Sequence, residues 1–402
     1  MIKYITAGES HGKGLTIIVE GFPTGFPLSE DYIQEDLARR QRGYGRGGRQ
    51  LIEKDRAEIL SGVRHGLTMG SPIAMFIPNK DYVNWGKVMS TDPVEDPGNT
   101  VTRLRAGHAD MPGTIKYGIS DVRNILERSS ARETAARVAA GAVAKRFLQE
   151  FGIEVHSHVI NIGGVLSKYQ HPVDWEKANA SEVHCIDPVA EAEMIKVIDQ
   201  AKEDGDTIGG AVEVVATGVP IGLGSHVHYE RKLDARLALA LMSIQACKAV
   251  AIGEGWEAAD LPGSQYHDTL EPIAEDGKAP VGPYPTASGP WHRATNRTGG
   301  IEGGMSTGMP LVARFAIKPI ATLAKPLPSV DLVTGKTVQA HFERSDVCNV
   351  PPAGVIGEAA VAFVLADAFL EKFGGDNVEE TKRNFNSYQK TIGPRSWVVS
   401  EE

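Results

Sequence analysis

Cysteine is scarce in this sequence, and its three cysteines form no recognisable pattern. Cys185, Cys247 and Cys348 are far apart, and none belongs to a Cys-x-x-Cys pair. An odd number of isolated thiols argues against a disulfide framework and against a cysteine-based zinc site. We therefore expect reduced thiols.

Convincing metal-ligand spacings are also lacking. His156 with His158 and His226 with His228 would each share one face of a strand, as metal ligands require. However, no carboxylate or cysteine lies near them at a spacing typical of a metal site. We predict surface or strand-face histidines and no metal.

Long uncharged apolar runs are missing. No stretch approaches the roughly 18 to 20 residues that cross a bilayer. The N-terminus reaches Glu9 without the basic start, apolar run and small-residue cleavage site of a secretory signal. With 42% hydrophobic and 23% charged residues, the composition is that of an ordinary globular chain, and we expect a soluble, cytoplasmic protein.

The sequence contains neither of the common glycine-rich nucleotide motifs. It has no Gly-x-x-x-x-Gly-Lys-[Ser/Thr] segment. The glycine runs at 45–48 and 299–304 do not lie between a strand and a helix of a βαβ unit. A Rossmann nicotinamide fold is therefore not expected.

Positive charge is locally concentrated although the formal net charge is -9. Residues 37–49 carry five arginines, and six more follow between 103 and 137. Arginine binds carboxylate and phosphate in a bidentate manner, so we expect small anionic ligands. A nucleic-acid-binding Arg-Gly segment is the alternative, but such proteins are typically basic and stack bases on aromatics, and only Tyr44 lies among these arginines.

Strands and helices are predicted in mixed order. Periodicity and capping residues predict strands at 2–6, 15–20, 56–61, 71–78, 211–217 and 311–317, and a hairpin turning at 334–335. They predict helices starting after the caps Ser29, Ser130 (a capping box with Glu133, running to about 151) and Asp187, and helices at 233–247 and 354–373.

This order lacks a regular βαβ alternation, which favours a layered α+β architecture over a doubly wound sheet. The length of 402 residues would allow two or three domains. Without internal repeats or a long linker, we predict one catalytic domain over residues 1–385 and a C-terminal tail over 386–402.

Three loops hold groups that can transfer protons. They are residues 8–12 with His11, residues 105–110 with His108, and residues 344–346 with Asp346. In the first two, glycines let the backbone approach a ligand closely. The predicted helix start at Ser129 and Ser130, preceded by Arg128, is a candidate anion site because free backbone donors, hydroxyls and a guanidinium could converge there.

These segments resemble the signatures of the chorismate synthases. The first is Gly8-Glu-Ser-His-Gly12, the second is Arg128-Ser-Ser-Ala-Arg-Glu-Thr-Ala135, and the third is Arg344-Ser-Asp346 leading to Glu358. Further matches at 61–66, 299–304 and 318–322 follow in the same order. The resemblance covers residues 1 to about 385. It is supported by several signatures that occur in the same order as in the family.

The resemblance implies a β-α-β sandwich of antiparallel sheets flanked by helices, assembled as a homotetramer. It implies a lyase that removes phosphate from 5-enolpyruvylshikimate 3-phosphate by anti-1,4 elimination to give chorismate, the last common step toward the aromatic amino acids. Reduced FMN would be required but not consumed. NADPH could be its reductant, or a separate flavin reductase could supply it.

The resemblance also implies roles for individual residues. His11 would be an acid near the departing phosphate, His108 a proton donor to the reduced flavin, and Asp346 a base relay near flavin N5. Ser10, Arg49, Arg105 and Arg132 would bind substrate, and Arg40 and Arg46 match positions associated with NADP. Flavin contacts would come from Arg128, Ser129, Ser130, Gln245, Ala246, Gly303, Lys318, Pro319, Ile320, Ala321, Thr322 and Arg344.

Two places depart from the family pattern. Ala106 stands where proline is usual, and residues 245–249 replace a proline- and glycine-containing segment. Neither departure removes a proton-transfer residue. A flavin oxidoreductase that turns over nicotinamide is the enzymatic alternative.

Overall fold

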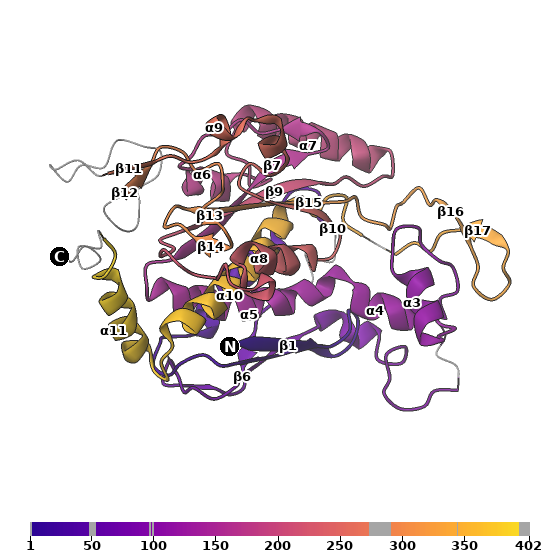
Figure 1. Cartoon of the computed structure of the whole chain (residues 1–402). Helices are drawn as coiled ribbons and strands as arrows, with labels where there is room; N and C mark the ends of the chain where they lie inside the picture. The colour runs from indigo at the N-terminus through magenta and orange to yellow at the C-terminus, as the bar shows by residue number, and fades with distance from the viewer. Residues whose placement is uncertain are drawn as a thin grey trace, which may run out of the picture.

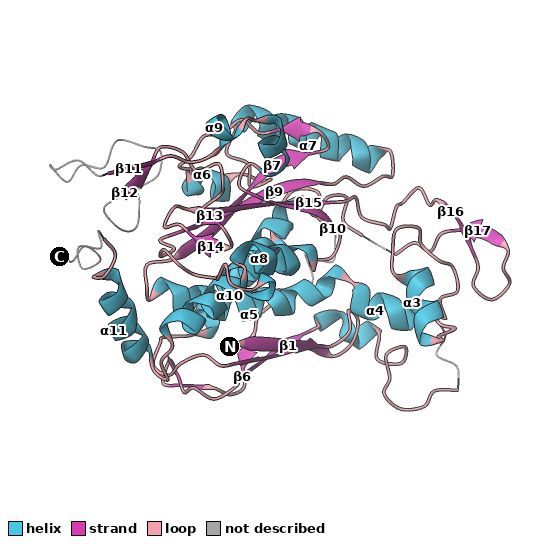
Figure 2. Cartoon of the chain, in the orientation of Figure 1, coloured by secondary structure: helices cyan, strands magenta, loops and turns pink. Residues whose placement is uncertain are grey.

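The computed structural model describes residues 2–47, 54–95, 98, 100–272, 291–343 and 345–393. Within these residues, two main antiparallel sheets enclose a layer of helices (Figure 1). Figure 2 shows the same layers by secondary structure, with further helices outside the sandwich. The predicted α+β class, a layered sandwich of antiparallel sheets flanked by helices, is confirmed.

The first sheet buries one face. In spatial order its strands are β1 (Lys3–Ala7), β2 (Gly14–Glu20), β6 (Ile73–Pro78) and β3 (Glu58–Ile59). Ile17 and Met75 are register partners and fully buried, whereas the neighbouring Ile18 is 41% exposed. Successive strand residues point to opposite faces, so one face packs on the helices and the other faces outward.

The second sheet is antiparallel throughout. In spatial order it contains β10 (Cys247–Ile252), β15 (Leu311–Ile317), β9 (Gly210–Thr217), β7 (Glu154–Ile162) and β8 (Val165–Leu166). The strands predicted at 211–217 and 311–317 are confirmed. Their inward residues, such as Val214 and Phe315, are buried against the helical layer.

The helical layer is formed mainly by α1 (Glu30–Gln41), α5 (Thr134–Gln149), α8 (Leu233–Met242) and α10 (Val350–Phe373). The helices α5 and α10 pack tightly where Gly141 meets Ala359, since a Cβ at Gly141 would lie 2.2 Å from the Ala359 Cβ. Glycine is therefore needed there for close packing rather than for backbone freedom.

Helix α10 is long and apolar enough to cross a membrane, but it lies in the core. It is the only described helix with that length and composition, and 78% of its apolar window is buried within the protein. It also carries charged residues, Glu358 and Asp367, inside its span. We interpret it as the central core helix.

Three predicted helix ends are wrong. The predicted helix at 233–247 ends at Met242, because Ala246 has a left-handed φ of 67° and Cys247 begins β10. The helix predicted from 354 already begins at Val350, where prolines occupy its first turn. Ser130 caps a short 3-10 turn, and the Glu133 carboxylate accepts hydrogen bonds from Thr6, Arg137 and Gln245 instead of closing a capping box.

The remaining elements are peripheral to the main sheets or connect them. They are β4 (Val63–Arg64), β5 (Leu67–Thr68), η1 (Lys80–Asn84), α3 (Asp110–Tyr117), α4 (Arg123–Ser129), η2 (Ala131–Glu133), α6 (Trp175–Ala180), α7 (Pro188–Glu203), η3 (Tyr229–Arg231), η4 (Gly255–Asp260), α9 (Gly263–Tyr266), β11 (Leu270–Pro272), β12 (Trp291–Arg293), β13 (Ile301–Glu302), β14 (Met305–Ser306), β16 (Pro328–Val330), β17 (Thr337–Gln339) and α11 (Val378–Gln389).

Helix α11 crosses the boundary predicted between the domain and the tail. Its Phe385 packs on Phe369 and Phe373 of α10, so the first residues of the predicted tail belong to a packed helix. Residues 394–402 lie outside the described residues. The division into one domain and a tail stays a prediction.

Candidate active site

One cavity gathers the three predicted proton-transfer residues. It has a volume of about 750 Å³ and is lined by loops from both sheets and by the start of α10. His11, His108 and Asp346 all line it, although 97 to 335 residues separate them along the chain. Of the other predicted site residues, the lining includes Ser10, Arg40, Arg46, Arg105, Ser129, Ser130, Arg132, Gln245, Ala246, Lys318, Pro319, Ile320, Ala321 and Thr322.

Four predicted site residues are not among the lining residues. Arg128 donates hydrogen bonds to the carbonyls of Thr6 and Gly8. Gly303 lies in the turn between β13 and β14. Arg49 and Arg344 lie outside the described residues.

His11 is held by Glu127, the residue just before the second signature. The His11 Nδ1 lies 2.9 Å from Glu127 Oε1, and the His11 backbone N–H donates to Oε2 over 2.7 Å. Burial raises the pKa of Glu127, but its hydrogen bonds with His11 outweigh that effect and leave the pKa lowered. The Trp85 ring lies against the imidazole, with the two centroids 4.0 Å apart.

His108 belongs to a second histidine–carboxylate pair. Its Nδ1 contacts Asp110 Oδ1, and Arg105 Nε donates to Asp110 Oδ2 over 2.9 Å. Burial raises the pKa of Asp110, but the hydrogen bonds from His108 and Arg105 outweigh it and lower the pKa to about 2. Arg105 also donates to Thr322 over 3.0 Å and so connects this loop to residues 318–322.

Asp346 accepts contacts from two residues of the arginine-rich segment. Its Oδ1 accepts the Gly47 backbone N–H over 2.6 Å, and its Oδ2 lies 2.8 Å from Arg46 Nη1. Burial lowers the pKa of Arg46, and the Asp346 carboxylate partly opposes that shift. Through this pair, the arginine-rich segment contacts the third signature.

Arg132 organises the loops through buried contacts. Its Nη1 donates to both Asp55 oxygens over 2.6 and 2.7 Å, and its Nε donates to Asn79 Oδ1 over 2.9 Å. The Asn79 amide nitrogen in turn donates to the carbonyl of Gly12 over 2.8 Å. Arg132 therefore fixes the His11 loop as well as lining the cavity.

The predicted anion site at Ser129 and Ser130 is only partly formed. The Ser129 hydroxyl donates to the Ile125 carbonyl over 2.7 Å, and the Ser130 hydroxyl accepts the Arg132 backbone N–H. Arg128 donates to the main-chain carbonyls of Gly8 and Thr6, and the convergence of these three residues on one anion stays a prediction. Both serines still line the cavity.

Sequence reasoning missed several residues that shape this cavity. Glu127 could have been found from the sequence, because it lies four residues after Arg123 on a short helix and directly precedes the second signature. Asp81 lies in η1 and Trp85 directly follows it, in a segment that carries no motif, and only the fold brings them to the cavity. Glu343 and Asn349 also line the cavity.

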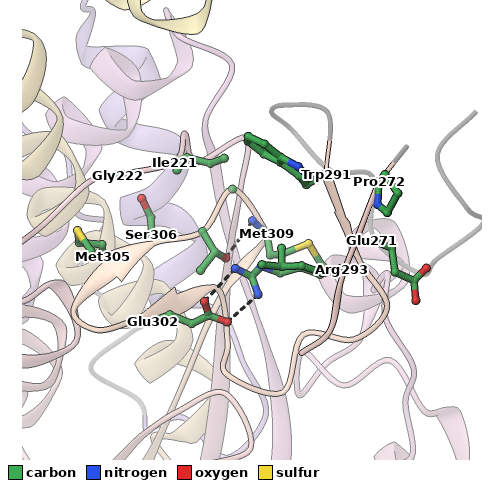
Figure 3. A pocket seen from close by; sticks show the side chains of 13 residues that line it. Ile221, Gly222, Glu271, Pro272, Trp291, Arg293, Glu302, Met305, Ser306 and Met309 are labelled. Atoms are coloured by element: carbon green, nitrogen blue, oxygen red, sulfur yellow. Dashed lines mark hydrogen bonds and ion pairs between the residues drawn. The ribbon is translucent and has the colours of Figure 1, made fainter. Parts of the chain in front are cut away.

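A second cavity of about 740 Å³ lies beside β11 to β14. Figure 3 shows its apolar side chains, including Trp291 and Met309. Its Arg293 and Glu302 are bound to each other by hydrogen bonds of 2.7 and 2.9 Å. The described residues of this cavity therefore offer no proton-transfer pair like those around His11 and His108.

The Asp110→Asn variant should show a pH-dependent loss of stability. Asp110 has a lowered pKa, so its stabilising effect is present above its ordinary value of 3.8 and is lost as pH falls through about 2. In urea titrations, the difference in unfolding free energy between wild type and variant should shrink by roughly 2 kcal/mol between pH 4 and pH 2. An exposed control, Asp260→Asn, should give a constant difference, and the same constancy in Asp110→Asn would contradict this account.

The fold and the cavity together define the class of protein. Two histidine–carboxylate pairs, a further carboxylate and several arginines around one cavity are the features of an enzyme that transfers protons on an anionic small molecule.

Comparison with known proteins gives the family. The chorismate synthase family profile matches residues 2–370. Chorismate synthases of Moorella thermoacetica and Carboxydothermus hydrogenoformans are 54% and 51% identical to this chain, each covering 98% of it and 99% of their own length. A crystal structure of a chorismate synthase matches with a TM-score of 0.76 and 44% identity, over 97% of this chain and 98% of that chain. This chain belongs to the chorismate synthase family.

Proposed function

We propose that this enzyme is a lyase that converts 5-enolpyruvylshikimate 3-phosphate to chorismate and phosphate by anti-1,4 elimination, with reduced FMN bound. The observation that carries the proposal is the meeting of His11, His108 and Asp346 at one arginine-lined cavity. Elimination needs a group that protonates the leaving phosphate and a base that takes the ring proton. The family relationship supports the choice of 5-enolpyruvylshikimate 3-phosphate as the proposed substrate.

His11 would act as the acid beside the departing phosphate. A nearby phosphate dianion favours the cationic imidazole, which is the form that donates a proton. Glu127 binds Nδ1, so proton exchange with a ligand would use Nε2. His11 thus has one ring nitrogen for positioning and one for chemistry.

His108 would donate a proton toward the flavin. Asp110 binds its Nδ1 in the same manner, and Lys318 donates to the carbonyl of Gly107 next to it. This contact joins the histidine loop to the 318–322 segment, for which the family resemblance implies flavin contacts. The two loops would therefore enclose one side of the cofactor together.

Asp346 would relay the ring proton near flavin N5. Its two contacts, with Gly47 and Arg46, fix the position of the carboxyl group at the cavity. Because both contacts come from the arginine-rich segment, the position of Arg46 and Gly47 would also set the position of the base.

The substrate's carboxylates and phosphate require cationic partners. Arg46, Arg105 and Lys318 line the cavity and keep N–H groups beyond the contacts described above. Arg49, proposed for the same role, lies outside the described residues. Arg132 would contribute through its charge, since all three of its nitrogens already donate to Asp55 or Asn79.

The residues of the cavity fit a flavin. Gln245 Oε1, Asn349 Oδ1 and Arg46 Nε are buried and have no hydrogen-bond partner among the described residues, and all three residues line the cavity. Buried polar atoms are rarely left without partners, so these three atoms suit a ligand that carries both donors and acceptors. When bound, reduced FMN would supply electron density that assists the loss of phosphate without net redox change.

Gln245→Ala should weaken FMN binding about tenfold. Gln245 donates to Glu133 over 2.9 Å, which fixes its amide and leaves Oε1 as the acceptor for a ligand N–H. Loss of one such hydrogen bond corresponds to roughly 1 to 1.5 kcal/mol, or about a tenfold higher Kd. Anaerobic titration of reduced FMN, with the substrate present, measures this change.

The control for that titration is Gln200→Ala on the outer helix α7, which should leave the Kd unchanged. Equal affinity of Gln245→Ala and wild type would remove Gln245 from the flavin site. If wild type itself does not bind FMN in the presence of substrate, the proposed function fails.

The remaining proposals concern partners. We place the enzyme in the cytoplasm as a homotetramer and expect its flavin to be reduced by a separate reductase or by NADPH. Arg40 is a poor candidate for contacting NADP, because its guanidinium is buried and donates to Thr134 and to the Ala131 carbonyl. Burial, the main cause, lowers the pKa of Arg40 to about 10.

A further inference from the structure

The imidazole of His11 is held by a set of groups outside the family signatures. Glu127 contacts its Nδ1 and its backbone N–H, and Trp85 covers one face of the ring. We infer that Glu127 is a positioning residue that fixes which ring nitrogen of His11 carries the proton. The inference rests on the role proposed for His11.

The hydrogen-bond pattern around Glu127 requires a group that only accepts. Its Oε1 receives His11 Nδ1 at 2.9 Å and Arg123 Nη1 at 3.2 Å, and its Oε2 receives the His11 backbone N–H at 2.7 Å. An ionised carboxylate has no donor, so Nδ1 must carry a hydrogen for this contact to be favourable. Nε2 is then the nitrogen that exchanges a proton with a ligand.

Arg123 links the same carboxylate to Glu343, which also lines the cavity. It donates to Glu127 and lies 2.9 Å from Glu343 Oε1, and its guanidinium lies 5.0 Å from the centroid of Trp85. The indole N–H of Trp85 donates to Asp81 over 3.0 Å. The imidazole is therefore enclosed by a carboxylate on one edge and by an anchored indole on one face.

The charged and titratable groups facing this cluster come from four segments. Arg123 lies on the same helix as Glu127, His11 lies on the 8–12 loop, and Asp81 lies in η1. Glu343 comes from the segment after β17, and His341 Nε2 lies 3.2 Å from it. Burial raises the pKa of Glu343, but His341 and Arg123 outweigh it and lower the pKa to about 2, so Arg123 stays paired with two anions.

A glutamine at position 127 cannot reproduce this pattern. If its nitrogen occupies the Oε2 position, it faces the backbone N–H of His11, and two donors meet. If its nitrogen occupies the Oε1 position, it faces Arg123 and can bind Nδ1 only when Nδ1 has lost its hydrogen. In the second arrangement Arg123 keeps Glu343 as its partner, whereas in the first the His11 backbone N–H loses its only acceptor among these groups. Glu127→Gln should therefore adopt the second arrangement and switch the tautomer.

The tautomer can be measured without any enzymatic reaction. In nitrogen-15 histidine-labelled full-length protein at high pH, the ring shifts of His11, identified by their loss in His11→Gln, report which nitrogen carries hydrogen. We expect the Nδ1–H tautomer in wild type and in Glu127→Asp, and the Nε2–H tautomer in Glu127→Gln. Persistence of Nδ1–H in folded Glu127→Gln would overturn the inference.

Glu150→Gln is the matched control. Glu150 also accepts from an arginine four residues earlier, Arg146, over 2.7 Å, but it does not line the cavity. It should leave the His11 shifts and the turnover unchanged. A shift in this variant equal to that in Glu127→Gln would show a general effect of removing charge and would also overturn the inference.

Turnover supplies the second measurement. A wrong tautomer should lower kcat of Glu127→Gln by about a hundredfold while KM changes less than about threefold, because the acid is misplaced but the substrate anions keep their partners. A tautomer switch with unchanged kcat would contradict a role in catalysis. Absence of turnover in wild type would instead refute the proposed function and leave the tautomer result interpretable.

Discussion

His11→Ala and His108→Ala should each lower the rate of chorismate formation by about 10² to 10⁴-fold, with the fold intact. A positioned acid or base contributes that much to a proton-transfer step. Both imidazoles line the cavity and are bound through Nδ1 to carboxylates, Glu127 and Asp110. Anaerobic rates with saturating reduced FMN and substrate, together with thermal unfolding of each variant, measure the effect.

His228→Ala is the control for these two variants. His228 is exposed beside η3 and does not line the cavity, so its removal should change neither rate nor stability. A rate within a few-fold of wild type in His11→Ala or His108→Ala would remove that histidine from the mechanism. Loss of rate together with loss of folding would assign a structural role instead.

Glu358→Gln should destabilise the protein by roughly 3 to 5 kcal/mol. Glu358 is fully buried in the middle of α10 and accepts from Arg39 over 2.6 Å, from Lys145 over 2.8 Å and from Ser157 over 2.7 Å. Asp36 is the second anion of this cluster and contacts both cations. Two partly buried cations are thus balanced by two carboxylates.

Removing one carboxylate leaves the cluster with an excess positive charge inside the helical layer. Burial opposes the ionisation of Glu358, but Lys145 and Arg39 outweigh it and hold the pKa of this carboxyl below its ordinary value. A glutamine keeps the shape but not the charge, so the loss is electrostatic rather than a packing defect. Urea unfolding at neutral pH measures the change in free energy.

Glu371→Gln is the matched control on the same helix. Glu371 binds Arg231 and Arg236 at the surface, where ion pairs contribute about 0 to 1 kcal/mol. The control should therefore unfold near wild type. Equal stability of Glu358→Gln and Glu371→Gln would show that the buried cluster does not stabilise the fold.

The sequence predicts elements well where the local signals agree. Ser29 caps α1 and Asp187 with Pro188 starts α7, as their side-chain chemistry indicates. It fails where tertiary contacts decide, as at Glu133, whose carboxylate serves Thr6, Arg137 and Gln245 instead of its own helix start. The predicted end of α8 is also wrong, because Ala246 has a left-handed backbone conformation that alanine rarely adopts.

Much of the site could be predicted because its signatures are contiguous in sequence. Motif loops supplied His11, His108 and Asp346, but their convergence depends on two sheets and α10. Trp85 and Glu343 could not be found this way, since no local pattern marks them and only the fold brings them to the cavity. Arginine content indicated anion binding, but it could not show that Arg132 and Arg128 are engaged by protein oxygens.

The most direct test is an anaerobic assay with purified protein, chemically reduced FMN and 5-enolpyruvylshikimate 3-phosphate, followed for chorismate and inorganic phosphate. The account predicts equal release of both products, with reduced FMN present in catalytic amount. A parallel reaction with NADPH and oxidised FMN shows whether the enzyme reduces its own flavin. Failure of well-folded, FMN-saturated protein to form either product, with steady NADPH oxidation in the absence of substrate, would contradict the lyase assignment and favour a flavin oxidoreductase.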